Sequence, residues 1–204
     1  SYIIVVHKID YTALIREYTS GHCRLFYESE DSFEELIHHC LKHFSCPYCR
    51  RAGFLILNGL IKGYKESSSK RDTRGHLIIC SARREGKRGC GKSFSVFLSK
   101  VIIYHTISSE SLWKFLANLC SDMASITAFR NVLSTFCDRT VYRIRSRLRN
   151  YTSTIRTNLL NCGSPPLCID TDPLLQTIKH LKTVFPDSSD PVATYQLTFM
   201  TQFI

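Results

Sequence analysis

The chain has 204 residues, 44% of them hydrophobic and 22% charged, which suits one globular domain or two small ones and excludes global disorder. Its net charge of +10 is concentrated in residues 46–160, where 21 Lys and Arg residues outweigh 6 Asp and Glu residues. Such a region is typical of a protein that binds a polyanion, most commonly nucleic acid, although a solvated basic surface is the alternative. No apolar run approaches the ~18 residues that span a bilayer, and the first residues lack signal-peptide features, so we expect a cytoplasmic protein that does not contact membranes.

The N-terminal region, residues 1–44, is expected to be a helical lead-in. Residues 2–6 are rich in β-branched side chains and predict a short strand. Capping residues and apolar spacing predict two helices, over 10–20 and 32–44. Residues 1–45 hold 7 Asp and Glu residues against 4 Lys and Arg, so the basic footprint of the protein lies outside this region.

Residues 45–104 have a different sequence pattern from that of the N-terminal region. Short apolar stretches at 54–57, 76–80 and 94–98 are separated by polar, basic loops. This pattern indicates a small β-unit whose core is too thin to be stable without additional support.

Helices are expected again in the remainder of the chain, first in residues 105–160 and then in a C-terminal extension, residues 161–204. Gly163 and the two prolines after Ser164 separate the two parts. The last two predicted helices each begin with Asp-Pro, which is a typical helix start. The predicted ranges are 109–120, 126–133, 138–151, 172–185 and 190–204.

The sequence Cys-Pro-Tyr-Cys at 46–49 has two interpretations. It has the form of a glutaredoxin-like dithiol, which follows a strand and starts a long helix. Here a helix is predicted before Cys46, the residues after Cys49 include Gly53 and Asn58-Gly59, and the Thr-Val-Pro loop of that family is missing. The sequence therefore favours the second interpretation, in which these cysteines are half of a metal site.

Cys80 and Cys90 complete that metal site. Four thiolates from two loops can bind one Zn²⁺ tetrahedrally at ~2.3 Å each, and the bound ion would supply the stability that a thin β-unit lacks. The nine residues between Cys80 and Cys90 are an unusually long spacing for one metal-binding turn. Two alternatives therefore stay open: one or more of these cysteines is simply buried, or His76 replaces one of them as a ligand.

The order of motifs CPYC (46–49), CGKSFSV (90–96), LWKFL (112–116) and DRTVYRIRSRL (138–148) resembles the zinc-ribbon plus helix-turn-helix DNA-binding region of bacterial insertion-sequence transposases. It is also similar to small uncharacterised bacterial proteins with this arrangement. The resemblance covers about residues 44–150. It implies an α+β protein, mostly α, with a small zinc ribbon (45–104) inserted between helical segments and followed by a helix-turn-helix-like domain (105–160).

The chain departs from the pattern of that family at three points. The second cysteine pair contains the insertion SARREGKRG. Arg50 stands where a glycine often follows the second cysteine. The turn before the predicted recognition helix lacks the usual glycine and is longer by one residue.

The predicted helix over 138–151 has an apolar face and an arginine-rich face, as a recognition helix requires, although an arginine-rich solvated face is the alternative. Residues near its start are expected to reach base edges, and later ones to meet phosphates. The base-edge candidates are Arg139, Tyr142, Arg143 and Ser146, and the phosphate candidates on the same helix are Arg145, Arg147 and Arg149. Further candidates are Arg83, Arg84, Lys87 and Arg88 in the insertion and Lys70, Arg71 and Arg74 in the preceding hairpin.

No complete catalytic motif is present. After residue 150 only four carboxylates follow, in a segment too short for a transposase catalytic domain, and His-x-Glu, His-Glu-x-x-His and phosphate-binding glycine loops are missing. We therefore expect a non-enzymatic, zinc-dependent protein that binds double-stranded DNA as an accessory or regulatory factor of a mobile element. Its C-terminal extension could contact a transposase, another protein or a second copy. An RNA-binding or protein-binding zinc ribbon, and less favourably a dithiol oxidoreductase, are the alternatives.

Overall fold

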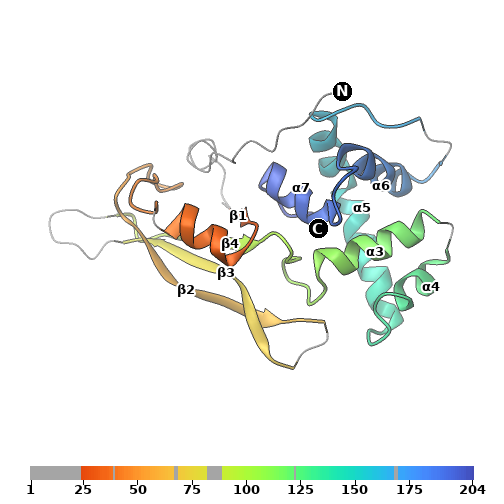
Figure 1. Ribbon diagram of the computed structural model, residues 1–204, viewed down its shortest axis with the longest axis horizontal. Helices are drawn as coiled ribbons and strands as arrows, with labels where there is room; N and C mark the ends of the chain where they lie inside the picture. The colour runs from red at the N-terminus through yellow and green to blue at the C-terminus, as the bar shows by residue number, and fades with distance from the viewer. Residues whose placement is uncertain (1–23, 39, 67–68, 82–88, 122, 168–169) are drawn as a thin grey trace. The chain divides into compact units, whose positions relative to one another are not determined.

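The computed structural model describes residues 24–204 except 39, 67–68, 82–88, 122 and 168–169 (Figure 1). The strand predicted over 2–6 and the helix predicted over 10–20 lie outside the described residues. The described part is an α+β protein with a four-stranded sheet and several helices, as the sequence predicts at this level. It divides into two units, Ser1–Lys62 with Thr73–Leu98 and Gly63–Asp72 with Ser99–Ile204.

The sheet contains β1 (Arg24–Tyr27), β2 (Leu55–Tyr64), β3 (Arg71–Cys80) and β4 (Ser93–Leu98), in the order β1-β4-β3-β2. β4 pairs antiparallel with β3 and parallel with β1. Gly75 in β3 lies so close to β4 that a Cβ atom would be 2.2 Å from the carbonyl oxygen of Val96. Three of these strands include or overlap the predicted apolar stretches, whereas β1 was not predicted.

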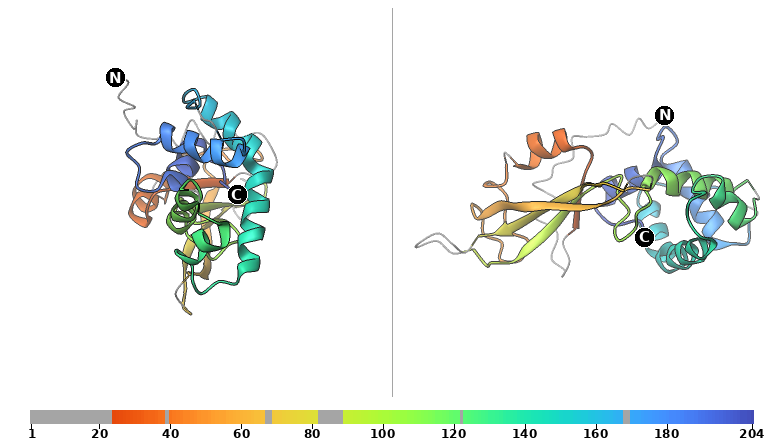
Figure 2. Two further views of the ribbon diagram at one scale, coloured as in Figure 1. Left: turned by 90° about the vertical axis from the view of Figure 1, so that its right-hand side faces the viewer. Right: turned by 90° about the horizontal axis from the view of Figure 1, so that it is seen from below.

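A short helical segment covers one face of this sheet (Figure 1, Figure 2). It consists of α2 (Glu30–Ser32) and the π-helix η1 (Phe33–His38), and Ser29 and Ser32 form a capping box at its start. The ring of Phe33 stacks on the imidazole of His76 in β3, with centroids 3.6 Å apart. The helix predicted over 32–44 is shorter than expected: the π-helix ends at His38, and residues 40–43 form turns.

The helical unit contains α3 (Ser109–Leu119), α4 (Ser125–Arg130), α5 (Asp138–Leu160), α6 (Pro173–Val184) and α7 (Pro191–Phe199). Side chains of Ser108, Asp172 and Asp190 cap α3, α6 and α7. The two Asp-Pro pairs begin α6 and α7, as the sequence predicts. α5 is longer than predicted, and α4 ends earlier. One hydrophobic core joins all five helices, so the C-terminal extension packs with the helices that precede it.

The tip of the β2–β3 hairpin, Gly63–Asp72, belongs to the helical unit. The carboxylate of Glu66 accepts hydrogen bonds from the backbone N–H of Ser108 and, at 2.6 Å, from the hydroxyl of Ser111. A carboxylate at the start of α3 is favoured by the helix dipole. Among the described residues, no helix has both the length and the apolar character needed to cross a bilayer.

Candidate functional site

The first cysteine pair lies in a tight turn, and the residues on either side of the turn, Ser45 and Ala52, form an isolated antiparallel β-bridge. The backbone N–H of Cys46 donates to the Arg51 carbonyl at 2.9 Å, and that of Arg50 donates to the Cys46 carbonyl at 2.8 Å. Arg50 adopts a left-handed conformation, with φ of 59°. Glycine adopts this conformation without steric cost, so Arg50 occupies a position at which glycine would be favoured.

The second pair lies where β3 ends and the chain approaches β4. The backbone N–H of Cys80 donates to the Lys92 carbonyl at 2.9 Å, and that of Gly91 donates to the Cys80 carbonyl at 2.9 Å. The N–H of Gly89 donates to the Ser81 carbonyl at 2.8 Å, which closes the base of the insertion. The long spacing between the two cysteines therefore does not separate them, because the insertion leaves and rejoins the chain at neighbouring points.

The structure brings the four predicted cysteines together, since their sulfur atoms all lie within 4.8 Å of one another. The Sγ atoms of Cys46 and Cys90 are 3.6 Å apart, and those of Cys49 and Cys80 are 3.8 Å apart. These separations are much longer than the ~2.05 Å of a disulfide bond. The four thiols form a site that could hold a metal ion.

Burial and hydrogen bonds within the thiol group shift the pKa values of Cys46, Cys49 and Cys80. Burial raises the pKa of Cys80 to about 12, and the neighbouring Cys46 and Cys49 add to the rise. Burial also raises the pKa of Cys46. Burial acts in the same direction on Cys49, but hydrogen bonds from the Arg51 backbone and from the other three thiols outweigh it and lower its pKa to about 7. One thiolate forms readily, and further ones need a cation to offset their mutual repulsion.

The structure bears on two of the alternatives left open by the sequence, the glutaredoxin-like dithiol and His76 as a metal ligand. The segment after Cys49 leads into the strand β2, and not into the long helix that follows a glutaredoxin-like dithiol. His76 is not a member of the thiol group: its Nε2 lies 2.8 Å from Oε2 of Glu30, and its ring stacks on Phe33.

The predicted base-edge residues lie in the first half of α5. Arg139, Tyr142, Arg143 and Ser146 are all exposed. The bidentate contact of Arg130 with Asp138, at 2.9 and 2.6 Å, connects the end of α4 to the start of α5. The first turns of α5 are thus held by a specific contact while their polar side chains remain accessible.

The three predicted phosphate contacts on α5 have different surroundings. Arg149 is exposed. Arg147 is also exposed and contacts Nε2 of His105 at 2.9 Å. Arg145 is half-buried and donates to the hydroxyl of Ser125 at 2.6 Å, so its guanidinium is directed toward α4 and has an intramolecular role in this structure.

The other predicted contacts come from the β2–β3 hairpin and from the insertion after Cys80. Lys70 and Arg71 are exposed at the hairpin tip, where the Arg71 guanidinium lies 5.3 Å from the centroid of the Tyr64 ring, and Arg74 is half-buried in β3. The insertion residues Arg83, Arg84, Lys87 and Arg88 lie outside the described residues.

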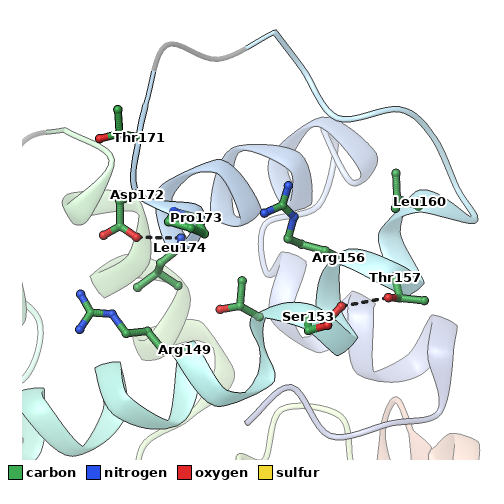
Figure 3. Close-up of a pocket in the computed structure, with 10 residues that line it drawn as sticks. Arg149, Ser153, Arg156, Thr157, Leu160, Thr171, Asp172, Pro173 and Leu174 are labelled. Atoms are coloured by element: carbon green, nitrogen blue, oxygen red, sulfur yellow. Dashed lines mark hydrogen bonds between the residues drawn. The ribbon is translucent and has the colours of Figure 1, made fainter.

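Arg156 was missed by the sequence interpretation, which ended the basic helix at 151. The buried residues Ile155 and Leu159 continue the apolar spacing of α5 and would have indicated the longer helix. Arg156 and Arg149 line a cleft of about 760 Å³ between α5 and the start of α6 (Figure 3).

Comparison with known proteins gives no match: no protein-family model, no curated protein and no solved structure matches this chain. The interpretation of the thiol group and of the α5 surface therefore depends on their geometry and chemistry.

Proposed function

We propose that this protein is a zinc-stabilised, non-catalytic DNA-binding protein that acts like the targeting region of a transposase, as an accessory or regulatory factor of a mobile element. The observation that carries the proposal is the arginine-rich exposed face of α5. A metal ion bound by the thiol group would stabilise the β-unit.

Zinc is the metal that the thiol group fits best. In a tetrahedral site with Zn–S distances of ~2.3 Å, the sulfur atoms lie ~3.8 Å apart. The observed separations of 3.6 Å and 3.8 Å are close to that value. Four thiolates are a typical ligand set of structural zinc sites and leave no open coordination position for a substrate. The bound ion would link the Cys46–Cys49 turn to the β3–β4 turn.

Nucleic acid is the polyanion that α5 fits best. Arg139 and Arg143 lie four residues apart, on one side of the helix, and neither guanidinium forms an ion pair or hydrogen bond with any residue that the structure describes. Their guanidinium groups can make the bidentate contacts with guanine that specify DNA sequence. Tyr142 lies between the two arginines in sequence and Ser146 follows them. Both are exposed and add hydrogen-bond donors and acceptors.

The arrangement of α4 and α5 is consistent with a helix-turn-helix-like reading of this region. Phe129 of α4 and Val141 of α5 are buried in the same core, and Arg130 binds Asp138 at the start of α5. A recognition helix needs this support, because its orientation determines which bases it reaches. The intervening segment, 131–137, is longer than the turn of three or four residues that is usual in this motif.

The proposal is tested by fluorescence anisotropy with the zinc-loaded protein and a labelled mixed-sequence duplex. We expect binding that weakens steeply with salt, and an R139Q/R143Q variant that loses preference among duplex sequences. The control K100Q/K114Q removes the same charge from exposed positions outside α5. If the variant and the control behave alike, α5 is not the recognition element. If structured RNA displaces duplex DNA at equal concentration, the protein is an RNA-binding zinc ribbon.

A further inference from the structure

The second half of α5 and the start of α6 form the walls of a cleft of about 760 Å³ (Figure 3). Its volume lies within the range of sites that hold small ligands or ligand groups. Seven of its ten lining residues have polar side chains, among them Arg149, Thr152, Ser153, Arg156, Thr157 and Asp172.

Two arginines give the cleft its charge. Arg149 and Arg156 are seven residues apart on α5, which places them on the same side of the helix about 10 Å apart along its axis. Figure 3 shows both side chains extending from α5, Arg149 below Asp172 in this view and Arg156 on the opposite side of Pro173 and Leu174. Within the described part of the chain, neither guanidinium has a hydrogen bond or an ion pair, whereas Arg145 and Arg147 of the same helix bind Ser125 and His105.

The remaining polar groups suit an anion with several oxygen atoms. The hydroxyl of Ser153 has no hydrogen-bond partner among the described residues and is free to donate. One carboxylate, Asp172, lies at the rim, where its Oδ1 accepts from the backbone N–H of Leu174 at 2.9 Å. The charged lining is thus two guanidinium groups against one carboxylate, and the positive end of the α6 dipole adds to the excess.

We propose that this cleft binds a phosphate group, and that the phosphate belongs to the backbone of the nucleic acid that α5 contacts. Guanidinium groups match phosphate oxygens in a bidentate geometry and remain charged at every physiological pH. The inference extends the proposed function. That the phosphate belongs to a nucleic acid depends on the proposed function, whereas the presence of a phosphate site in the cleft does not.

The position of the cleft along α5 fits a backbone contact. Tyr142, Arg149 and Arg156 recur every seven residues, so they follow one side of the helix. Arg156 lies about 20 Å along the axis from Tyr142, which exceeds the ~12 Å width of the major groove. If α5 enters that groove with its first turns and runs across it, its second half passes over a phosphate backbone.

The test compares three forms of the zinc-loaded 204-residue chain: wild type, R149Q/R156Q, and the charge-matched control K100Q/K114Q. Anisotropy with a mixed-sequence duplex gives affinity and salt dependence for each form. For R149Q/R156Q we expect about tenfold weaker binding that is the same for all duplex sequences, and a log affinity–log salt slope shallower by ~0.9 for each phosphate lost. In parallel, inorganic phosphate is titrated into each form, and the backbone amides of Ser153 and Leu174 are followed by NMR.

The outcomes separate this inference from the proposed function. If wild type binds DNA and R149Q/R156Q matches K100Q/K114Q in affinity and slope, the cleft inference is overturned and the proposed function stands. If wild type binds no DNA, the proposed function fails and the phosphate titration decides. Phosphate-dependent shifts that R149Q/R156Q abolishes support a site for a small phosphorylated ligand, and unchanged amides overturn the inference. Unaltered thermal unfolding of the variant shows that its fold is intact.

Discussion

Substitution of Gly89 by alanine should disrupt the thiol group without removing a ligand. A Cβ atom at this position would lie 2.4 Å from the Ser81 carbonyl oxygen and 2.6 Å from Sγ of Cys80. Both distances are far below van der Waals contact, and one of the two atoms belongs to the backbone. The base of the insertion would therefore have to open, and Cys80 would have to move away from Cys90.

The free-energy cost of Gly89→Ala can be worked out from these contacts. Opening the base breaks the 2.8 Å hydrogen bond from the Gly89 N–H to the Ser81 carbonyl, which is worth about 1 kcal/mol. Relief of the overlap with Cys80 adds about 1–3 kcal/mol, as is usual for overpacked positions. If the whole cost of about 2–4 kcal/mol falls on the metal-bound form, zinc affinity decreases by about 30- to 700-fold.

The assay is competition for Zn²⁺ against a colorimetric chelator at fixed pH, with wild type and G89A side by side. Gly163→Ala is the matched control, because its added Cβ would meet no atom within 4 Å. We expect the control to bind zinc as wild type does. Wild-type affinity in G89A would refute the reasoning, since the four sulfurs could not then be arranged around one ion as the structure places them.

Three further predictions concern the same site. Cys90→Ser should abolish stoichiometric zinc binding, measured by elemental analysis after dialysis, whereas Cys162→Ser should retain it. Arg50→Gly should raise the free energy of unfolding by about 0.5 kcal/mol in chemical denaturation, because relief of the left-handed strain exceeds the entropic cost of glycine; a loss of stability would contradict this. Zinc affinity should rise with pH, because the raised pKa values of Cys46 and Cys80 make zinc displace protons. The slope of log affinity against pH should be steeper by about one unit below pH 7 than above it, because Cys49, with a pKa of about 7, also releases a proton there; an equal slope on both sides would contradict the acidity of Cys49.

Features that depend on nearby residues were predictable. Ser108, Asp172 and Asp190 each bond the backbone of the helix that follows, and Pro173 and Pro191 occupy first-turn positions. These signals operate within a few residues, so they do not require knowledge of the fold. The starts of α6 and α7 were predicted for this reason.

Features that depend on distant partners were not predictable in the same way. β1 is four residues long and exists because it pairs with β4, about 70 residues later in the chain. The inward direction of Arg145 depends on Ser125 of α4. The group of four cysteines was predictable only in part. Its members could be identified from the sequence, but that the long insertion keeps Cys80 and Cys90 close depends on the hydrogen bond between Gly89 and Ser81.

The hydrogen bond between Gly89 and Ser81 has a consequence for how such a protein can diversify. Because the insertion departs and returns at one backbone contact, its length and chemistry can change between descendants while the ligand sulfurs keep their places. Other peptides could therefore be inserted at this position. Replacement of residues 82–88 by segments of other composition should change what the β-unit binds without changing its fold.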